Sequence, residues 1–123
     1  MIRLCFVLGC LFAFVGVALG AFGAHILKNR LTSEMLDIFE VGVRYQMVHA
    51  FALFVVAWAS SHWGNANFSI SASLFVCGII LFSGSLYLLS LTGAGWLGAI
   101  TPVGGMMFLL GWFYLALTIW RTR

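Results

Sequence analysis

Long apolar runs separated by short polar or glycine-rich stretches dominate the chain. Four of them, 4–24, 45–63, 70–91 and 102–120, contain no Asp, Glu, Lys or Arg. As helices these runs would extend about 28 to 33 Å, which matches the ~30 Å hydrocarbon core of a bilayer. We therefore predict an all-α integral membrane protein, with four transmembrane helices in a compact bundle and a single domain covering 1–123. An arginine before the first run and small residues at its end also fit a secretory signal, but we expect a retained span.

The longest polar stretch, 25–44, separates the first two apolar runs. Thr32 can cap a helix, and Glu34 suits the positive end of the helix dipole. Beyond these two residues, polar and apolar side chains separate onto different faces, with Glu40 and Arg44 at the i,i+4 spacing of an ion pair. The pattern predicts a short amphipathic helix of about three turns in the first loop, lying in the interface or against the bundle.

Small residues recur at helical spacing within the apolar runs. Gly16 and Gly20 lie on one face of the first predicted helix, where two backbones can approach closely. This face fits a second copy of the chain or another helix of the same chain, and the pattern does not decide between them. The glycines that we expect to pack helices are Gly16, Gly20, Gly23, Gly78, Gly84, Gly104 and Gly105.

Polar side chains occur at depths where hydrocarbon would otherwise surround them. Gln46 and His49 share a face of the second span, and an ionisable residue at membrane depth costs on the order of 3 kcal/mol or more without a partner. We therefore expect this face to turn toward neighbouring helices, and one of the mid-depth serines of the third span to face the second helix. The predicted polar packing cluster consists of His25, Ser83, Ser85 and Tyr87.

Composition excludes a soluble domain. The chain is 63% hydrophobic and 7% charged, with a mean hydropathy of +1.12, whereas soluble domains carry about 25% charged residues. The net charge of +3 comes from basic residues at the chain ends and in one loop, without the basic face of a nucleic-acid-binding protein. We expect these residues to contact lipid headgroups and to set topology.

The number of spans places both termini on the same side of the membrane. The side with the termini carries three basic residues (Arg3, Arg121 and Arg123), and the other side also carries three (Lys28, Arg30 and Arg44). The positive-inside count is therefore tied. We expect both termini in the cytoplasm, because all three acidic residues lie on the other side.

Four motifs together resemble the YgdD/YwdK family of small bacterial inner-membrane proteins, which carry a domain of unknown function numbered 423. The motifs are LGAFGAH at 19–25, YQMVHA at 45–50, LFSGSLY at 81–87 and ITPVGG at 100–105. The resemblance implies a four-span protein of the bacterial inner membrane and no known activity. The residues that it singles out are Gly20, Gly23, His25, Tyr45, Gln46, His49, Ser83, Gly84, Ser85, Pro102 and Gly105.

No complete catalytic set is present in the sequence. A serine of the third span beside His49 would supply a nucleophile and a base, but no acidic residue lies at that depth to orient the imidazole. His25 and His49, with an acidic residue of the first loop, would form a metal ligand set, but no pair has a metal-motif spacing. We expect no catalytic residue, no bound metal and no cofactor, and we favour a protein that is not an enzyme.

Two function hypotheses follow. The first is a structural or accessory membrane protein that acts as a homo-oligomer, with membrane lipids as its other partners. The alternative is a binding or transport protein for a lipid, quinone, proton or small ion. Its candidate ligand-binding residues are Glu40, Arg44, Tyr45, Gln46 and His49.

Overall fold

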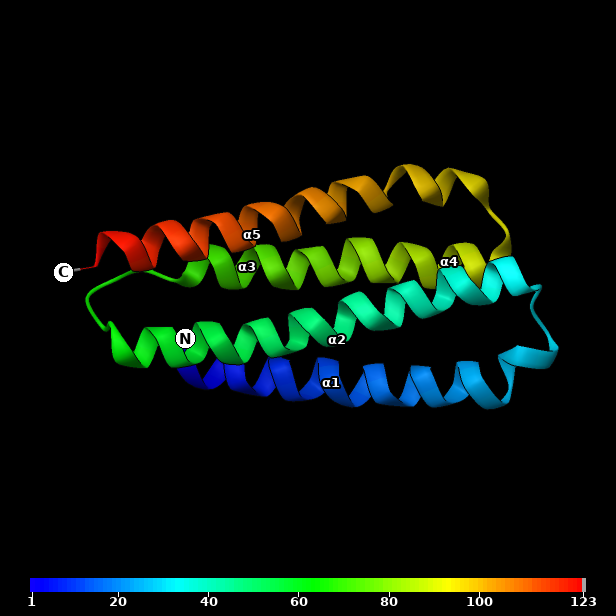
Figure 1. Cartoon of the computed structure of the whole chain (residues 1–123), viewed down its shortest axis with the longest axis horizontal. Coiled ribbons are helices and arrows are strands. Elements are labelled where there is room, and N and C mark those ends of the chain that lie inside the picture. The colour runs from blue at the N-terminus through cyan, green and yellow to red at the C-terminus, as the bar shows by residue number, and fades with distance from the viewer. Residues whose placement is uncertain (123) are drawn as a thin grey trace.

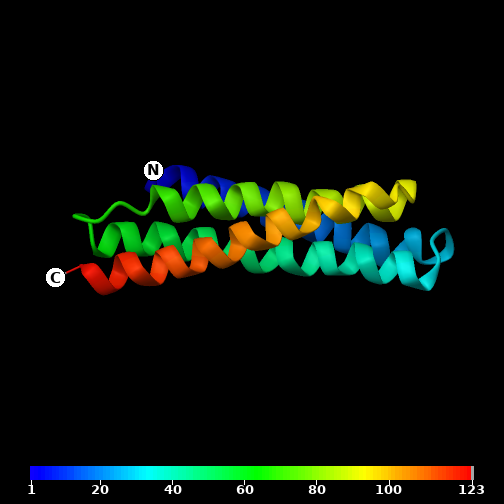
Figure 2. The same ribbon diagram turned by 90° about the horizontal axis from the view of Figure 1, so that it is seen from above.

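Four helical rods lie side by side and alternate in direction along the length of the molecule (Figures 1 and 2). The computed structural model describes residues 1–122. The elements are α1 (Ile2–His25), η1 (Leu27–Asn29), α2 (Ser33–His62), α3 (Ser69–Gly78), η2 (Ile79–Ser83), α4 (Gly84–Thr92), η3 (Gly95–Ala99) and α5 (Thr101–Arg121). The π-helical segment η2 joins α3 and α4 into one rod. Four helical segments are long and apolar enough to cross a membrane, which confirms the predicted all-α membrane class.

Helix α2 is continuous from Ser33 to His62, whereas the sequence predicted a separate amphipathic helix ahead of the second span. Thr32 caps it as predicted, because its Oγ1 accepts a hydrogen bond of 3.2 Å from the backbone N–H of Met35. Gly42 does not break the helix, since it packs against another helix and a Cβ there would lie 2.8 Å from the Tyr87 ring. At about 45 Å, α2 is longer than the hydrocarbon core, so its charged first turns reach the interface.

The small-residue face of α1 is filled by α2 of the same chain. A Cβ added to Gly16 would lie 2.5 Å from the Met47 sulfur, and one added to Gly23 would lie 3.0 Å from the Phe39 ring. Of the two alternatives that the sequence left open, the structure therefore shows the internal seam. Glycine at these positions lets the α1 and α2 backbones approach closely, as membrane helices commonly do.

A second glycine seam joins α5 to the α3–α4 rod. A Cβ on Gly104 would collide with the backbone nitrogen of Phe82 and lie 2.7 Å from its Cα, and one on Gly78 would lie 2.5 Å from the Phe108 ring. Gly84 differs from the prediction, because no atom lies within 4 Å of the position that its Cβ would take. Gly84 is therefore an ordinary helical position without a packing role.

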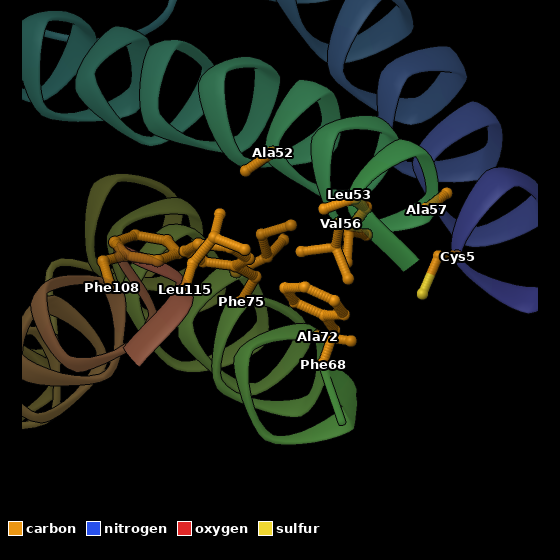
Figure 3. Close-up of a cluster of buried hydrophobic side chains, with 12 residues drawn as sticks. Cys5, Ala52, Leu53, Val56, Ala57, Phe68, Ala72, Phe75, Phe108 and Leu115 are labelled. Carbon is orange, nitrogen blue, oxygen red and sulfur yellow. The ribbon is translucent and has the colours of Figure 1, made fainter. Parts of the chain in front are cut away.

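Buried apolar side chains gather where α2, α3 and α5 meet (Figure 3). Phe75 of α3 and Phe108 of α5 belong to this cluster together with the α2 residues Leu53 and Val56. The turn before α3 adds Phe68, which is fully buried. This cluster occupies the half of the bundle toward the α2–α3 turn. The other half of the bundle combines polar contacts with further buried apolar side chains, among them Phe39 and Leu86.

Replacing Gly104 with alanine should destabilise the bundle by about 1–3 kcal/mol, because the added methyl group meets backbone that cannot move aside. Gly84→Ala is the matched control, since the space is open there and alanine favours a helix by about 0.5–1 kcal/mol over glycine. Unfolding of the two variants in mixed detergent micelles measures the difference. Equal stability of the two variants would contradict the close contact between α5 and η2.

Candidate functional site

The packing of α1 on α2 places His49 near the middle of the apolar layer. At one end Gly23 contacts Phe39, and at the other Gly9 lies against Ala50. Gly16, two residues from the centre of the apolar run 4–24, contacts α2 at Met47. His49 therefore lies at about the same level as the middle of α1, close to the bilayer midplane.

Both ring nitrogens of His49 are bound to protein groups. Nδ1 lies 2.7 Å from the carbonyl oxygen of Tyr45, and the indole N–H of Trp112 donates to Nε2 over 3.1 Å. A carbonyl oxygen only accepts and an indole N–H only donates. The pair of contacts therefore requires the neutral imidazole with its proton on Nδ1, and neither nitrogen is left for a metal, a substrate or a proton.

Aromatic rings enclose the imidazole. Phe108 stacks on it with a centroid separation of 3.5 Å and an interplanar angle of 7°, and Phe75 approaches at 5.6 Å. His49 is 3% exposed as a result. The sequence prediction missed Trp112, whose indole N–H in the middle of an apolar run was the available signal because it needs a partner at that depth.

Gln46 links three helices through one side-chain amide. Its NH₂ group donates to the carbonyl oxygen of Phe12 in α1 over 2.8 Å, and its oxygen accepts from the Tyr87 hydroxyl of α4 over 2.7 Å. The Phe12 carbonyl can only accept, so it fixes which way the amide points. A Cβ on Gly16 would lie 3.6 Å from the Gln46 nitrogen, an ordinary contact, so Gly16 is required by the packing of Met47 and not by this hydrogen bond.

The two mid-depth serines bind backbone carbonyls. Ser83 donates to the carbonyl oxygen of Gly42 in α2 over 2.7 Å, so one of the two serines faces the second helix, as predicted. Ser85 donates to the carbonyl oxygen of Phe82 over 2.9 Å and lies 2.7 Å from the Thr101 hydroxyl. Thr101 is the first residue of α5, and this contact ties α5 to α4.

The remaining candidates do not join these contacts. His25 is exposed at the end of α1, and Glu40 and Arg44 are exposed on α2. His25 is near the level of Phe39, so about 15 Å of helix separates it from the level of His49. Within residues 1–122, no three His, Cys, Asp or Glu side chains gather where they could hold a metal ion. Ser83 and Ser85 bind backbone carbonyls and the Thr101 hydroxyl rather than His49.

A groove of about 570 Å³ lies on the surface between α2 and α5. It is lined largely by apolar side chains, and His49 and Trp112 form part of its wall. Tyr45 lies at its edge, 42% exposed, with its ring 4.8 Å from that of Phe82. The side chain of Tyr45 is therefore exposed at this groove, whereas that of His49 is buried.

The Gln46–Tyr87 bond should show a measurable coupling energy. In a double-mutant cycle of Gln46→Leu with Tyr87→Phe, we expect a coupling of about 0.5–1.5 kcal/mol, the range for hydrogen bonds between membrane helices. The control cycle pairs Gln46→Leu with Tyr114→Phe on α5 and should give a coupling near zero. Unfolding in mixed micelles supplies the four free energies of each cycle, and equal coupling in both would contradict the bond.

Comparison with known proteins places the chain in a family. A family model described as a protein of unknown function, DUF423, matches residues 19–105. The UPF0382 membrane protein YwdK of Bacillus subtilis is 44% identical over 110 residues, covering 89% of each chain. A UPF0382 membrane protein of Staphylococcus haemolyticus is 38% identical over 119 residues, covering 97% of each. One from Haemophilus influenzae is 40% identical over 110 residues, covering 89% of this chain and 88% of the relative. No solved structure matches. The chain therefore belongs to the DUF423 (UPF0382) family of membrane proteins of unknown function.

Proposed function

We propose that the chain is a non-catalytic accessory protein of the bacterial inner membrane, in which the midplane polar groups fix helix packing. The observation that carries this proposal is that both nitrogens of His49 and both ends of the Gln46 amide are bound to protein groups. General-base catalysis and metal binding need a lone pair that faces the reactant. In this bundle the lone pair of His49 Nε2 accepts from Trp112 of α5, and the Gln46 oxygen accepts from Tyr87 of α4, so both acceptors link helices.

Such a protein would act by binding other membrane components, and we propose that one of them is a second copy of the chain. The glycine faces are occupied within the bundle, so a second copy would bind an outer surface, and we assign it to the outer surface of α1. Most contacts of α1 are with α2, and Phe14 projects from its outer side, 73% exposed. A groove of about 610 Å³ lies beside Phe14, lined by α1 and by Met47, Phe51 and Phe54 of α2.

A projecting ring beside a groove suits a two-fold dimer, because each copy can insert Phe14 into the groove of the other. In lipid such an interface is held by close packing rather than by the hydrophobic effect, so a ring that fills a groove is the kind of contact it requires. The termini would lie on the same side of the membrane in both copies.

The native cysteines test this dimer. Cys10 is exposed and lines the groove beside Phe14, so a short bis-maleimide should cross-link two copies in membranes. Cys10→Ser should abolish the dimer band, and Cys77→Ser, which removes an exposed cysteine on α3, should leave it unchanged. Phe14→Ala should reduce cross-linking several-fold. Monomeric mass in lipid discs, or cross-linking that survives Cys10→Ser, would contradict the proposal.

The groove between α2 and α5 supports a second candidate function, which is to bind a lipid or quinone-like molecule. Tyr45, which is 42% exposed at the edge of the groove, would meet the polar part of such a molecule, and the aromatic side chains that line the groove would meet its apolar part. A proton or small ion is less well supported, because neither nitrogen of His49 is left for a proton or an ion.

A substitution that fills the groove between α2 and α5 distinguishes ligand binding from the proposed accessory role. Met106 lines the groove, so Met106→Trp should remove any small molecule that copurifies with the protein and leave folding intact. Leu110→Trp is the matched control on the same helix, at an exposed position outside the groove lining. Native mass spectrometry from lipid discs measures the retained molecule. Identical retention by the two variants, or none by the wild type, would refute this second function.

A further inference from the structure

A polar cavity lies at the end of the bundle near the C-terminus, away from the midplane contacts and both apolar grooves. Its volume is about 460 Å³, and it is enclosed by the turn between α2 and α3 and by the last turns of α5. The side chains that matter are His62, Asn65, Asn67, Tyr114, Thr118 and Arg121. We infer that this cavity binds the phosphate group of an anionic phospholipid.

The charge distribution along the chain favours an anion here. The three acidic residues of the sequence, Glu34, Asp37 and Glu40, all lie at the opposite end of the bundle. Arg121 therefore meets no acidic side chain at its own end. A guanidinium offers a fork of N–H donors that matches two phosphate oxygens at once.

The other polar groups supply further donors. The side-chain oxygen of Asn67 already accepts from the backbone N–H of Ser69 over 3.0 Å and from its hydroxyl over 2.5 Å. This leaves the NH₂ group of Asn67 for a ligand in the cavity. Tyr114 and Thr118 add hydroxyl groups along the wall formed by α5. A phosphate diester carries acceptors only, so a lining rich in donors is complementary to it.

The depth of the cavity favours a lipid over a free ion. Tyr114 and Arg121 are about 10 Å apart along α5, which exceeds the ~5–8 Å headgroup layer on one side of a bilayer. The indole rings of Trp58 and Trp63 pack at the same end, 5.5 Å apart, as in the aromatic belts at membrane surfaces. The cavity thus reaches from the headgroups to the edge of the hydrocarbon, where a phospholipid places its phosphate and the start of its acyl chains.

Native mass spectrometry of the full chain with added lipid tests the inference. The wild type should bind phosphatidylglycerol at least fivefold more tightly than phosphatidylcholine with the same acyl chains. Arg121→Gln should reduce the affinity for phosphatidylglycerol roughly five- to tenfold, the scale of one basic residue at a membrane surface. Arg30→Gln, the same change in the exposed first loop, should leave it unaltered.

A second variant keeps the local fold while adding a negative charge to the cavity. Asn67→Asp retains the oxygen that accepts from Ser69 but adds a negative charge to the cavity, so it should also weaken phosphatidylglycerol binding, by about tenfold, without loss of helix content. Equal effects of Arg121→Gln and Arg30→Gln would overturn the inference, as would equal affinity for the two lipids. Competition by inorganic phosphate as effective as that by the lipid would assign the cavity to a free anion. None of these outcomes depends on the proposed dimer or on the groove between α2 and α5.

Discussion

A polar group inside hydrocarbon must find its partner within the protein, and this requirement organises the middle of the bundle. Gln46 and Ser83 meet it by binding backbone carbonyls of neighbouring helices. Each of these carbonyl oxygens lies inside a helix and already accepts a backbone hydrogen bond there. A second donor can reach the oxygen only where no side chain covers it. The accepting residue is either glycine itself, at Gly42, or lies one turn before a glycine, as Phe12 precedes Gly16. Both glycines also let side chains of the neighbouring helix pack closely, because a Cβ on Gly16 would lie 2.5 Å from the Met47 sulfur and one on Gly42 would lie 2.8 Å from the Tyr87 ring.

These contacts specify the arrangement of the helices more than they stabilise it. Hydrogen bonds between membrane helices contribute about 0.6 kcal/mol on average, which is small beside close packing over a whole seam. Rotating α2 by one residue, however, would turn Gln46 and His49 about 100° toward lipid and leave Tyr87 and Trp112 without partners. The rotated arrangement would be unfavourable, because several polar groups would lie unpaired in hydrocarbon. The polar residues therefore exclude wrong registers that apolar packing alone would tolerate.

The class of fold was predictable because the bilayer permits so few solutions. Charge-free runs of helical length can only be spans, and the inward turn of Gln46 and His49 followed from the cost of exposing them. The partners were not predictable, because they depend on register between helices. In the sequence, His25 precedes the first loop and His49 follows it. The antiparallel packing of α1 and α2 nevertheless separates the two residues by about 15 Å along the helix axes. The continuity of α2 was missed because the polar stretch that ends at Arg44 was treated as separate from the charge-free run that begins at Tyr45, whereas one helix contains both.

The polar groups of Gln46 and His49 are bound within the protein, so a ligand or partner would bind at the surface or at an end of the bundle. The two ends differ in charge. Counting lysine and arginine alone gives no preferred orientation, but the acidic residues are confined to the end opposite the termini. If the cavity beside Arg121 holds an anionic lipid, the end with the termini gains attraction of about 1 kcal/mol per basic residue to a negatively charged leaflet. Anionic lipids give the cytoplasmic leaflet its negative surface potential. A lipid site at this end therefore favours termini in the cytoplasm, which is the orientation that the position of the acidic residues also suggests.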